Sequence, residues 1–514
     1  MTSSSVYCFV SSGRIHCVPV NSVIEYSNSV APPPTIVIDG DINGDGKEIR
    51  TDIDESRLKI RNKNLLYTLN NPSLSDIESD VGDDSFNSES NGDSNDYLTN
   101  VIDNYAAHSL YLPEFAINLD EDLNDGYGQI KQLLKKVFKT WQDLSNIEVK
   151  RLTGGITNML LKCTYNSKEI VLMRVYGQGT NLIIDRHREF ISHLVLNSMH
   201  LAPPVHARFK NGLVYGFLQG RSLEPNELKS PNLYPLIAQQ LGNWHSKINI
   251  NEIHKGVNQL REYTRSHKRR QSFQQIKRES SDLKKEKKSK KKYISSVWEL
   301  IEDWIDVVPV INELIESFQN NTKVELNDEN IRDFIKKEFK WLKDTLESHI
   351  DSPIVSSHGD LLSGNIIIPS EDWLNQPFQN LPPINENPIK FIDYEYMLPA
   401  PRAFDIANHL AEWQGFDCDR SAIPQPTSKN ETMVNWVKAY LNNSNAGHDE
   451  VKGLINEIAS YYGLPGFYWG IWSVIQSEIS NIDFNYSTYA TLRLQEYWDW
   501  KNSFVERFPQ YSNS

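Results

Sequence analysis

The sequence predicts an α+β protein in which a small antiparallel β lobe precedes a large, mainly helical lobe. Between residues 147 and 218, short apolar and β-branched runs are separated by glycine or asparagine turns, which is typical of hairpins. From residue 234 onward, apolar residues recur at helical spacing instead. A chain of 514 residues with 39% hydrophobic content can bury the cores of both lobes.

Composition limits the function and the compartment. The net charge of −14 argues against a nucleic-acid-binding protein. The 4 cysteines lie far apart without paired spacing, so we expect neither a zinc site nor a disulfide framework, and a reducing cytoplasm suits them. We expect no signal peptide, and the apolar window 466–475 is too short to cross a bilayer.

The chain divides into three regions. Residues 1–105 are expected to be an extension, largely disordered with at most a short β segment, because the tract 73–96 is rich in Asp, Ser and Asn and has little apolar surface to bury. Residues 106–220 are predicted to form the N-terminal lobe, and residues 221–510 the helical C-terminal lobe. A basic insertion at 264–292 interrupts the second lobe and is expected to be a disordered loop.

The N-terminal lobe is expected to contain one amphipathic helix and a five-stranded antiparallel sheet. The Asn211-Gly212 pair is a strong signal for the last hairpin. The predicted helix is 130–144, and the predicted strands are 147–152, 159–165, 170–175, 206–210 and 213–218.

A glycine turn separates the first two of these strands. Gly154 and Gly155 would let backbone amides approach phosphate oxygens, and Thr157 and Asn158 would add polar groups. Most Gly-Gly pairs are simple turns, so the motif is weak alone. Its position in a hairpin lobe nevertheless favours a nucleotide-binding turn.

Arg174 lies on the third strand, and Asp185 caps a following helix that carries Glu189. We expect Glu189 to pair with Arg174, whose guanidinium can hold phosphate oxygens. The alternative is a purely structural ion pair. After the last hairpin, the segment containing Gly216 and Leu218 is expected to be the hinge against which adenine packs.

The C-terminal lobe is predicted to be helical over 234–248, 294–310 and 331–350. The intervening basic insertion has two alternative interpretations, a nuclear localisation signal or a patch that meets anionic lipid. Within it, Ser272 follows Arg269-Arg-Gln and resembles a site for basic-directed phosphorylation. His245, on the first predicted helix, is expected to be a hydrogen-bonded core residue and not a ligand.

The strongest chemical motif is His358-Gly-Asp360 with Asn365 five residues after Asp360, followed by an apolar strand that ends in Asp393. This spacing reproduces a kinase catalytic loop and its later metal-binding Asp. Asp360 would accept the proton of the attacking hydroxyl, while Asn365 and Asp393 would hold Mg²⁺ against the phosphates of ATP. A plain polar turn is the alternative, but the upstream β lobe argues against it.

Six motifs in order resemble the choline/ethanolamine kinase family: 151–158, 171–177, 358–365, 391–396, 404–413 and 467–472. The segment 202–220 more closely resembles the ethanolamine kinase branch. The resemblance implies a protein-kinase-like fold, ATP and Mg²⁺ as cofactors, and a cytoplasmic first step of phospholipid head-group synthesis. One departure is Gly359, which stands where relatives often have Asn.

An amino-alcohol acceptor carries a positive charge, so its pocket needs aromatic faces and a carboxylate. Trp469 and Trp472 could contribute such faces together with Tyr396 and Tyr489, and Glu412 resembles the acid that the family places beside the ammonium group. Aromatic residues at helical spacing are usually core residues. The family resemblance favours the pocket.

Three functions compete. The first is phosphorylation of ethanolamine to phosphoethanolamine, which the resemblance places at the start of phosphatidylethanolamine synthesis by the CDP-ethanolamine route. The second is a choline kinase, a dual choline/ethanolamine kinase or an aminoglycoside-type phosphotransferase. The third is a non-catalytic nucleotide-binding scaffold, which the intact Asp360, Asn365 and Asp393 disfavour. The sequence leaves a homodimer open.

Overall fold

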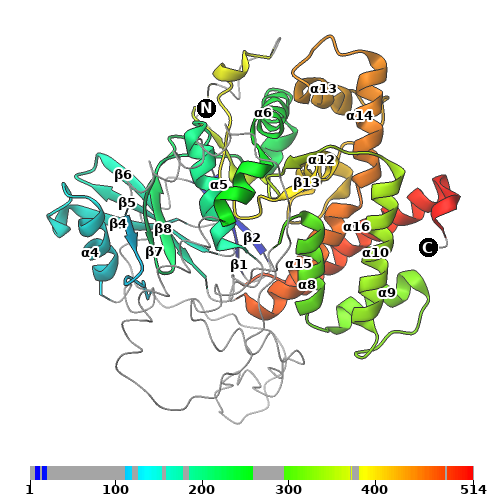
Figure 1. Ribbon diagram of the computed structural model, residues 1–514, viewed down its shortest axis with the longest axis horizontal. Coiled ribbons are helices and arrows are strands. Elements are labelled where there is room, and N and C mark those ends of the chain that lie inside the picture. The colour runs from blue at the N-terminus through cyan, green and yellow to red at the C-terminus, as the bar shows by residue number, and fades with distance from the viewer. Residues whose placement is uncertain are drawn as a thin grey trace, which may run out of the picture.

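The computed structural model contains an antiparallel sheet on one side and a mass of helices on the other (Figure 1). It describes residues 6–11, 14–19, 110–118, 125–152, 158–177, 184–258, 294–370, 372, 381–480 and 483–512. The predicted α+β fold class, with a β lobe before a helical lobe, is confirmed.

The sheet of the N-terminal lobe has six strands in the order β3-β7-β8-β6-β5-β4. Neighbouring strands are antiparallel except β3, which pairs parallel to β7. The prediction of five strands was therefore incomplete: β3 has only three residues, too few to show an alternating pattern. The strands are β3 (Leu110–Leu112), β4 (Ile147–Leu152), β5 (Asn158–Tyr165), β6 (Glu169–Tyr176), β7 (Val205–Phe209) and β8 (Gly212–Gly216).

Helix α4 (Gly128–Val137) covers one face of this sheet with its apolar side, which includes Ile130 and Leu133. It ends before Trp141, which the predicted helix included. Trp141 is nevertheless buried, stacks on Tyr165 with ring centroids 5.1 Å apart, and donates its indole N–H to Glu169. These residues belong to a small core that is separate from the main one.

Helix α5 (Arg186–Ser198) begins at the predicted cap, because the Asp185 side chain accepts hydrogen bonds from the backbone N–H groups of His187 and Arg188. Its apolar residues, such as Phe190, pack into the large core of the C-terminal lobe and not into the small core. The helix thus belongs to the first lobe in sequence and to the second lobe in packing.

The chain passes between the lobes at residues 217–222. Gly220 has a φ of 131°, and a Cβ atom there would lie 2.4 Å from the carbonyl oxygen of Ile368, so only glycine fits this close approach. Strand β9 (Arg221–Ser222) then pairs with β11 (Ile366–Ile368), which also pairs with β12 (Lys390–Phe391). A second short pair joins β10 (Ile354–Ser356) to β13 (Pro399–Pro401).

The three helices predicted for the C-terminal lobe are present, although the second, α8, is shorter than expected; no ranges were predicted for α9 or for the helices after residue 400. Helix α15 is buried on nearly every side along its first three turns. No helix in the described ranges is long and apolar enough to cross a membrane. The helices are α6 (Tyr234–Lys247), α8 (Val297–Val307), α9 (Asn312–Thr322), α10 (Ile331–His349), α12 (Arg402–Ala411), α13 (Glu431–Tyr440), α14 (His448–Tyr461), α15 (Leu464–Ile479) and α16 (Tyr486–Arg507).

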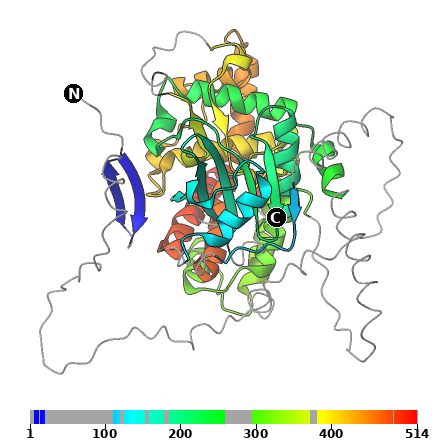
Figure 2. The same ribbon diagram turned by 90° about the vertical axis from the view of Figure 1, so that its left-hand side faces the viewer.

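Within the extension, β1 (Val6–Ser11) and β2 (Arg14–Pro19) form a two-stranded sheet of their own, which Figure 2 shows apart from the two lobes. The other predictions for the extension lie outside the described residues. The same is true of those for the insertion 264–292 and for Ser272.

Candidate active site

Asp360 and Asn365 lie together in the loop between β10 and β11. The Asn365 side-chain N–H₂ donates to the backbone carbonyl of Asp360 at 2.8 Å and to its carboxylate at 3.1 Å. These two hydrogen bonds hold Asp360 and Asn365, which are five residues apart in the sequence, next to each other in the structure. They leave the Asn365 amide oxygen as the atom that could coordinate a cation.

Asp393 reaches the same place through the pairing of β11 with β12. Ile366 pairs with Phe391, and the backbone N–H of Ile392 donates to the carbonyl of Asn365 at 3.0 Å. Asp393 itself has a φ of 68°, a left-handed conformation that is uncommon for residues other than glycine. Strained backbone of this kind concentrates at functional sites.

Arg174 extends from β6 of the N-terminal lobe to the same acids. Its Nη1 lies 2.8 Å from the Asp393 carboxylate and 3.0 Å from that of Glu189, so the predicted pairing with Glu189 is present. Burial works against the charge on this guanidinium, and the facing carboxylates, Asp393 foremost, outweigh that effect and raise the pKa of Arg174. The two lobes therefore meet through a charged contact.

Negative charge accumulates around Asp360. Burial raises the pKa of this carboxyl well above its ordinary value, and the nearby carboxylates of Asp393, Glu412 and Glu395 raise it further. No three His, Cys, Asp or Glu side chains of the described residues cluster closely enough to hold a metal by themselves. One carboxylate and one amide oxygen fit Mg²⁺, which typically takes one or two protein ligands and completes its shell with phosphates and water.

The catalytic-loop backbone is held by α12, a role that the sequence analysis did not assign. The buried Asp405 carboxylate accepts from the backbone N–H groups of His358 and Gly359, at 2.8 and 2.9 Å, and lies 2.8 Å from His245 Nε2. Asn408 donates to the Gly359 carbonyl at 2.9 Å. His245 is thus a hydrogen-bonded core residue, as predicted.

Gly359 has a φ of 78°, and a Cβ atom there would lie 2.5 Å from the carbonyl oxygen of Tyr396. A side chain at this position would require the loop to shift. Glycine at position 359, where relatives often have Asn, therefore suits the close approach of this loop to the backbone of Tyr396.

Tyr396, Trp469 and Trp472 form one buried cluster next to the catalytic loop. The Trp472 indole N–H donates to the Tyr396 hydroxyl at 2.7 Å, and the Trp469 indole N–H donates to Asn408 at 2.8 Å. Tyr396 meets Trp469 edge-on, with ring centroids 5.8 Å apart. Asn408, which also holds Gly359, links this cluster to the loop that carries Asp360.

Glu412 and Tyr489 form a second cluster around Arg493 of α16. Arg493 donates to the Tyr489 hydroxyl at 3.0 Å, and it lies 3.5 Å from the Glu412 carboxylate and 3.2 Å from that of Glu496. Burial raises the pKa of Glu412, and Arg493 opposes this effect. Contacts between the rings of Trp472, Tyr486, Phe484 and Tyr489 connect the two clusters. We call this continuous set of packed rings, with Tyr396 and Trp469, the aromatic wall; the predicted acceptor residues belong to it or adjoin it.

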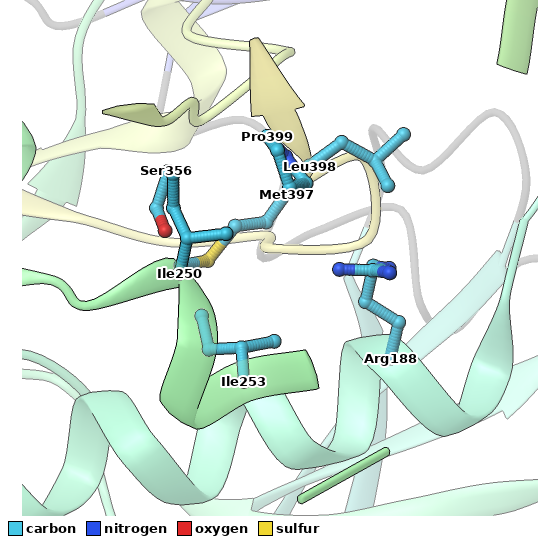
Figure 3. Close-up of a pocket in the computed structure, with 7 residues that line it drawn as sticks. All are labelled: Arg188, Ile250, Ile253, Ser356, Met397, Leu398 and Pro399. Atoms are coloured by element: carbon cyan, nitrogen blue, oxygen red, sulfur yellow. The ribbon is translucent and has the colours of Figure 1, made fainter. Parts of the chain in front are cut away.

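The remaining predicted positions are less informative. Gly154, Gly155 and Thr157 lie outside the described residues, and Asn158 is the first residue of β5. Gly216 ends β8, and Leu218 lies in the connection between the lobes. A small recess elsewhere (Figure 3) contains none of the predicted site residues; it is lined by Arg188, Ile250, Ile253, Ser356, Met397, Leu398 and Pro399.

An antiparallel lobe joined to a helical lobe, with a carboxylate, an amide and a second carboxylate at the junction, defines a phosphotransferase with a protein-kinase-like fold. Comparison with known proteins identifies its family. The sequence model of the choline/ethanolamine kinase family matches residues 149–498, and the chain belongs to this family. It is therefore a kinase that uses ATP, and the family implies a small amino-alcohol acceptor and a role in phospholipid biosynthesis.

The relatives include proteins named ethanolamine kinase. The chain is 33% identical to "Ethanolamine kinase" of Drosophila melanogaster over 66% of its own length and 55% of the fly protein. It is 30% identical to "Ethanolamine kinase 2" of Rattus norvegicus, over 75% of this chain and 84% of the rat protein. Among solved structures, the ethanolamine kinase of Plasmodium vivax has the same fold, with a TM-score of 0.52 and 22% identity over 82% of this chain and 96% of that one.

Proposed function

We propose that the enzyme transfers the γ-phosphoryl group of ATP to the hydroxyl of ethanolamine, giving phosphoethanolamine and ADP. Two observations support ethanolamine as the acceptor. The fly and rat relatives carry that name, and the segment 202–220 resembles the ethanolamine kinase branch. The reaction would open phosphatidylethanolamine synthesis by the CDP-ethanolamine route in the cytoplasm. A homodimer stays a prediction.

In the proposed reaction, the ethanolamine oxygen forms a bond to the γ-phosphorus while the bond between that phosphorus and the β–γ bridging oxygen breaks. Asp360 orients the hydroxyl and accepts its proton. Asn365 and Asp393 would hold Mg²⁺, which neutralises phosphate charge when bound. Arg174, held by Glu189, contacts the phosphates from the other lobe, as a pre-placed guanidinium can do without reorganising.

The ammonium end of the acceptor is proposed to face the aromatic wall and Glu412. Arg493 lies between Glu412 and Glu496, so this group of three carries one more negative charge than positive. A single excess negative charge suits one ammonium ion. Cation–π attraction to Trp469 or Trp472 would add about 0.5–2 kcal/mol per well-placed ring.

The observation that carries the proposal is the meeting of Asp360, Asn365 and Asp393 beside Arg174 of the opposite lobe. The test is a coupled phosphotransfer assay of the purified full-length chain with ethanolamine, N-methylethanolamine and choline. We expect kcat/KM to fall as methyl groups are added. An Asp360→Asn variant, expected to be inactive on all three amines, controls for contaminating kinases.

Choline is the second candidate, because aromatic faces recognise a quaternary ammonium well and need no hydrogen-bond acceptor. A higher kcat/KM for choline than for ethanolamine would replace ethanolamine as the proposed acceptor. It would leave the proposed roles of Asp360, Asn365 and Asp393 untouched.

A further inference from the structure

Arg174 is one member of a closed ring of four buried charges. Glu189 divides its carboxylate between two arginines, with Oε1 3.0 Å from Arg174 and Oε2 2.9 Å from Arg186. On the other side, Glu395 Oε2 lies 3.4 Å from Arg174 and 3.0 Å from Arg186. Side-chain exposure within this ring is at most 9%. The charges of two guanidiniums and two carboxylates thus neutralise each other at a buried position.

The ring crosses the junction between the lobes. Arg174 comes from β6, and Arg186 and Glu189 come from the first turn of α5. Glu395 follows Asp393 by two residues in the C-terminal lobe. The guanidinium of Arg186 also lies over the ring of Tyr176, 4.1 Å from its centroid, and Tyr176 is two residues beyond Arg174 on the same face of β6. Arg186 therefore contacts β6, α5 and the segment after Asp393, which are the same parts of the chain that surround Arg174.

One nitrogen of Arg174, Nη1, faces three carboxylates with only two hydrogens. Its 3.4 Å distance to Glu395 is the longest of the three, and Arg186 is nearer to the same oxygen. If Arg186 lost its charge, the ring would hold two carboxylates and only one guanidinium. A buried excess of negative charge is costly, so the Arg174 guanidinium would be drawn further into the ring and away from Asp393.

We propose that Arg186 is a positioning residue for nucleotide binding. Its positive charge pairs with Glu395 and with one carboxylate oxygen of Glu189, and so keeps Arg174 directed at Asp393 and at the phosphates. The inference rests on the proposed role of Arg174 in binding phosphate, and it is independent of which amine accepts the phosphoryl group. Arg186 itself need not contact ATP.

The experiment measures the KM of ATP, the KM of the amine, the Kd of a non-hydrolysable ATP analogue and the Tm for a set of full-length variants. Arg186→Met removes the charge at similar side-chain size, and Arg186→Lys restores it. Arg188→Met is the matched control, because Arg188 lies two residues further along the same helix, is also buried, and donates to the backbone carbonyl of Ile294 at 2.8 Å. Arg174→Met tests the role on which the inference depends.

We expect Arg186→Met to raise the KM and Kd for the nucleotide about tenfold or more, as when a buried charge network is broken, with the amine KM changed less than about twofold. Arg186→Lys should recover most of this loss, whereas Arg188→Met should lower the Tm without changing nucleotide affinity selectively. Equal changes in both KM values, no change, or an equal nucleotide effect in Arg188→Met would overturn the inference.

Two further outcomes separate the inference from its premise. If Arg174→Met leaves nucleotide affinity intact, the proposed phosphate role of Arg174 fails. If Arg174→Met loses affinity and Arg186→Met does not, only the inference about Arg186 fails. Should Arg186→Met not fold, the charge-balanced double variant Arg186→Met with Glu395→Gln replaces it. A nucleotide KM within about threefold of wild type supports the proposal, and a tenfold rise contradicts it.

Discussion

Asp405→Asn tests whether the catalytic loop depends on α12, because it changes one atom and one charge at a buried position. The Asp405 carboxylate faces three donors: the backbone N–H groups of His358 and Gly359, and Nε2 of His245. An asparagine side chain keeps one oxygen and gains an N–H₂ group. His245 can change tautomer and accept from that group, but a backbone N–H cannot.

In either orientation of the asparagine amide, at least one backbone N–H beside Asp360 is left facing another donor. An unpaired buried donor costs about 1–3 kcal/mol. Loss of the charge-assisted bonds adds about 1 kcal/mol, so we expect the free energy of unfolding to fall by about 2–4 kcal/mol. Because the unpaired group adjoins Asp360, kcat should also fall about tenfold or more, since small displacements of a reacting group are costly.

Urea unfolding followed by tryptophan fluorescence measures the first effect, and steady-state kinetics measures the second. Asp499→Asn is the control: Asp499 pairs with Arg420 at the surface, where both side chains are 45% exposed, and its loss should cost at most about 0.5 kcal/mol. An Asp405→Asn enzyme as stable and as active as the control variant would refute the view that Asp405 holds the loop.

The same variant has a defined pH dependence. Burial favours the neutral acid at Asp405, but the bonds from His245 and the two backbone amides outweigh it, so its pKa is lowered below 3.8. A lowered folded-state pKa gives stability that is present above pH 3.8 and lost as the pH falls through the folded-state value. The advantage of wild type over Asp405→Asn should therefore be constant near neutrality and shrink only below about pH 4.

Three further predictions concern the site and its surroundings. Asp393→Ala should lower kcat about a thousandfold or more with the fold retained; an active variant would remove Asp393 from the proposed metal site. Trp472→Leu should raise the KM of the amine about 3- to 30-fold and leave that of ATP unchanged, whereas an unchanged amine KM would make Trp472 a plain core residue. Burial lowers the pKa of His193, His358 and His409 from 6.5 to about 4. Between these two pH values the unfolded chain binds more protons than the folded chain. The stabilising contribution of the three histidines, present above pH 6.5, is therefore lost as the pH falls toward 4. Each should contribute about 1.4 kcal/mol per pH unit in this window, and urea unfolding at pH 7, 6 and 5 that shows constant stability would contradict the assignment.

The strands, the cap at Asp185 and the meeting of Asp360 with Asn365 were predictable because each depends on residues close in sequence. Alternation, a capping side chain and a five-residue spacing are local signals. Strand β3 could not be predicted, because three residues carry no readable period and its partner β7 begins more than 90 residues later. The same limit hid the parallel pairing at the edge of the sheet.

The supporting charges were hidden for a different reason. Asp405 lies inside the segment 404–413 that resembles the family, yet nothing in its neighbours predicts that it accepts a hydrogen bond from a loop 46 residues earlier. Arg186 and Glu395 are likewise ordinary charged residues in the sequence, and only the meeting of the lobes makes them partners over 209 positions. The predicted Glu189–Arg174 pair was half of a larger network.

The way in which the junction divides its charges between the lobes matches the two substrates of a kinase. Arg174 and Arg186 come from the N-terminal part of the chain together with one carboxylate, Glu189, whereas Asp360, Asp393 and Glu395 come from the C-terminal lobe. Opposite charges attract across the junction. The same division offers cations on the side where phosphates would bind and carboxylates on the side where a metal and an ammonium group would bind. One arrangement of charge can thus both join the lobes and select ligands of opposite sign at its two ends.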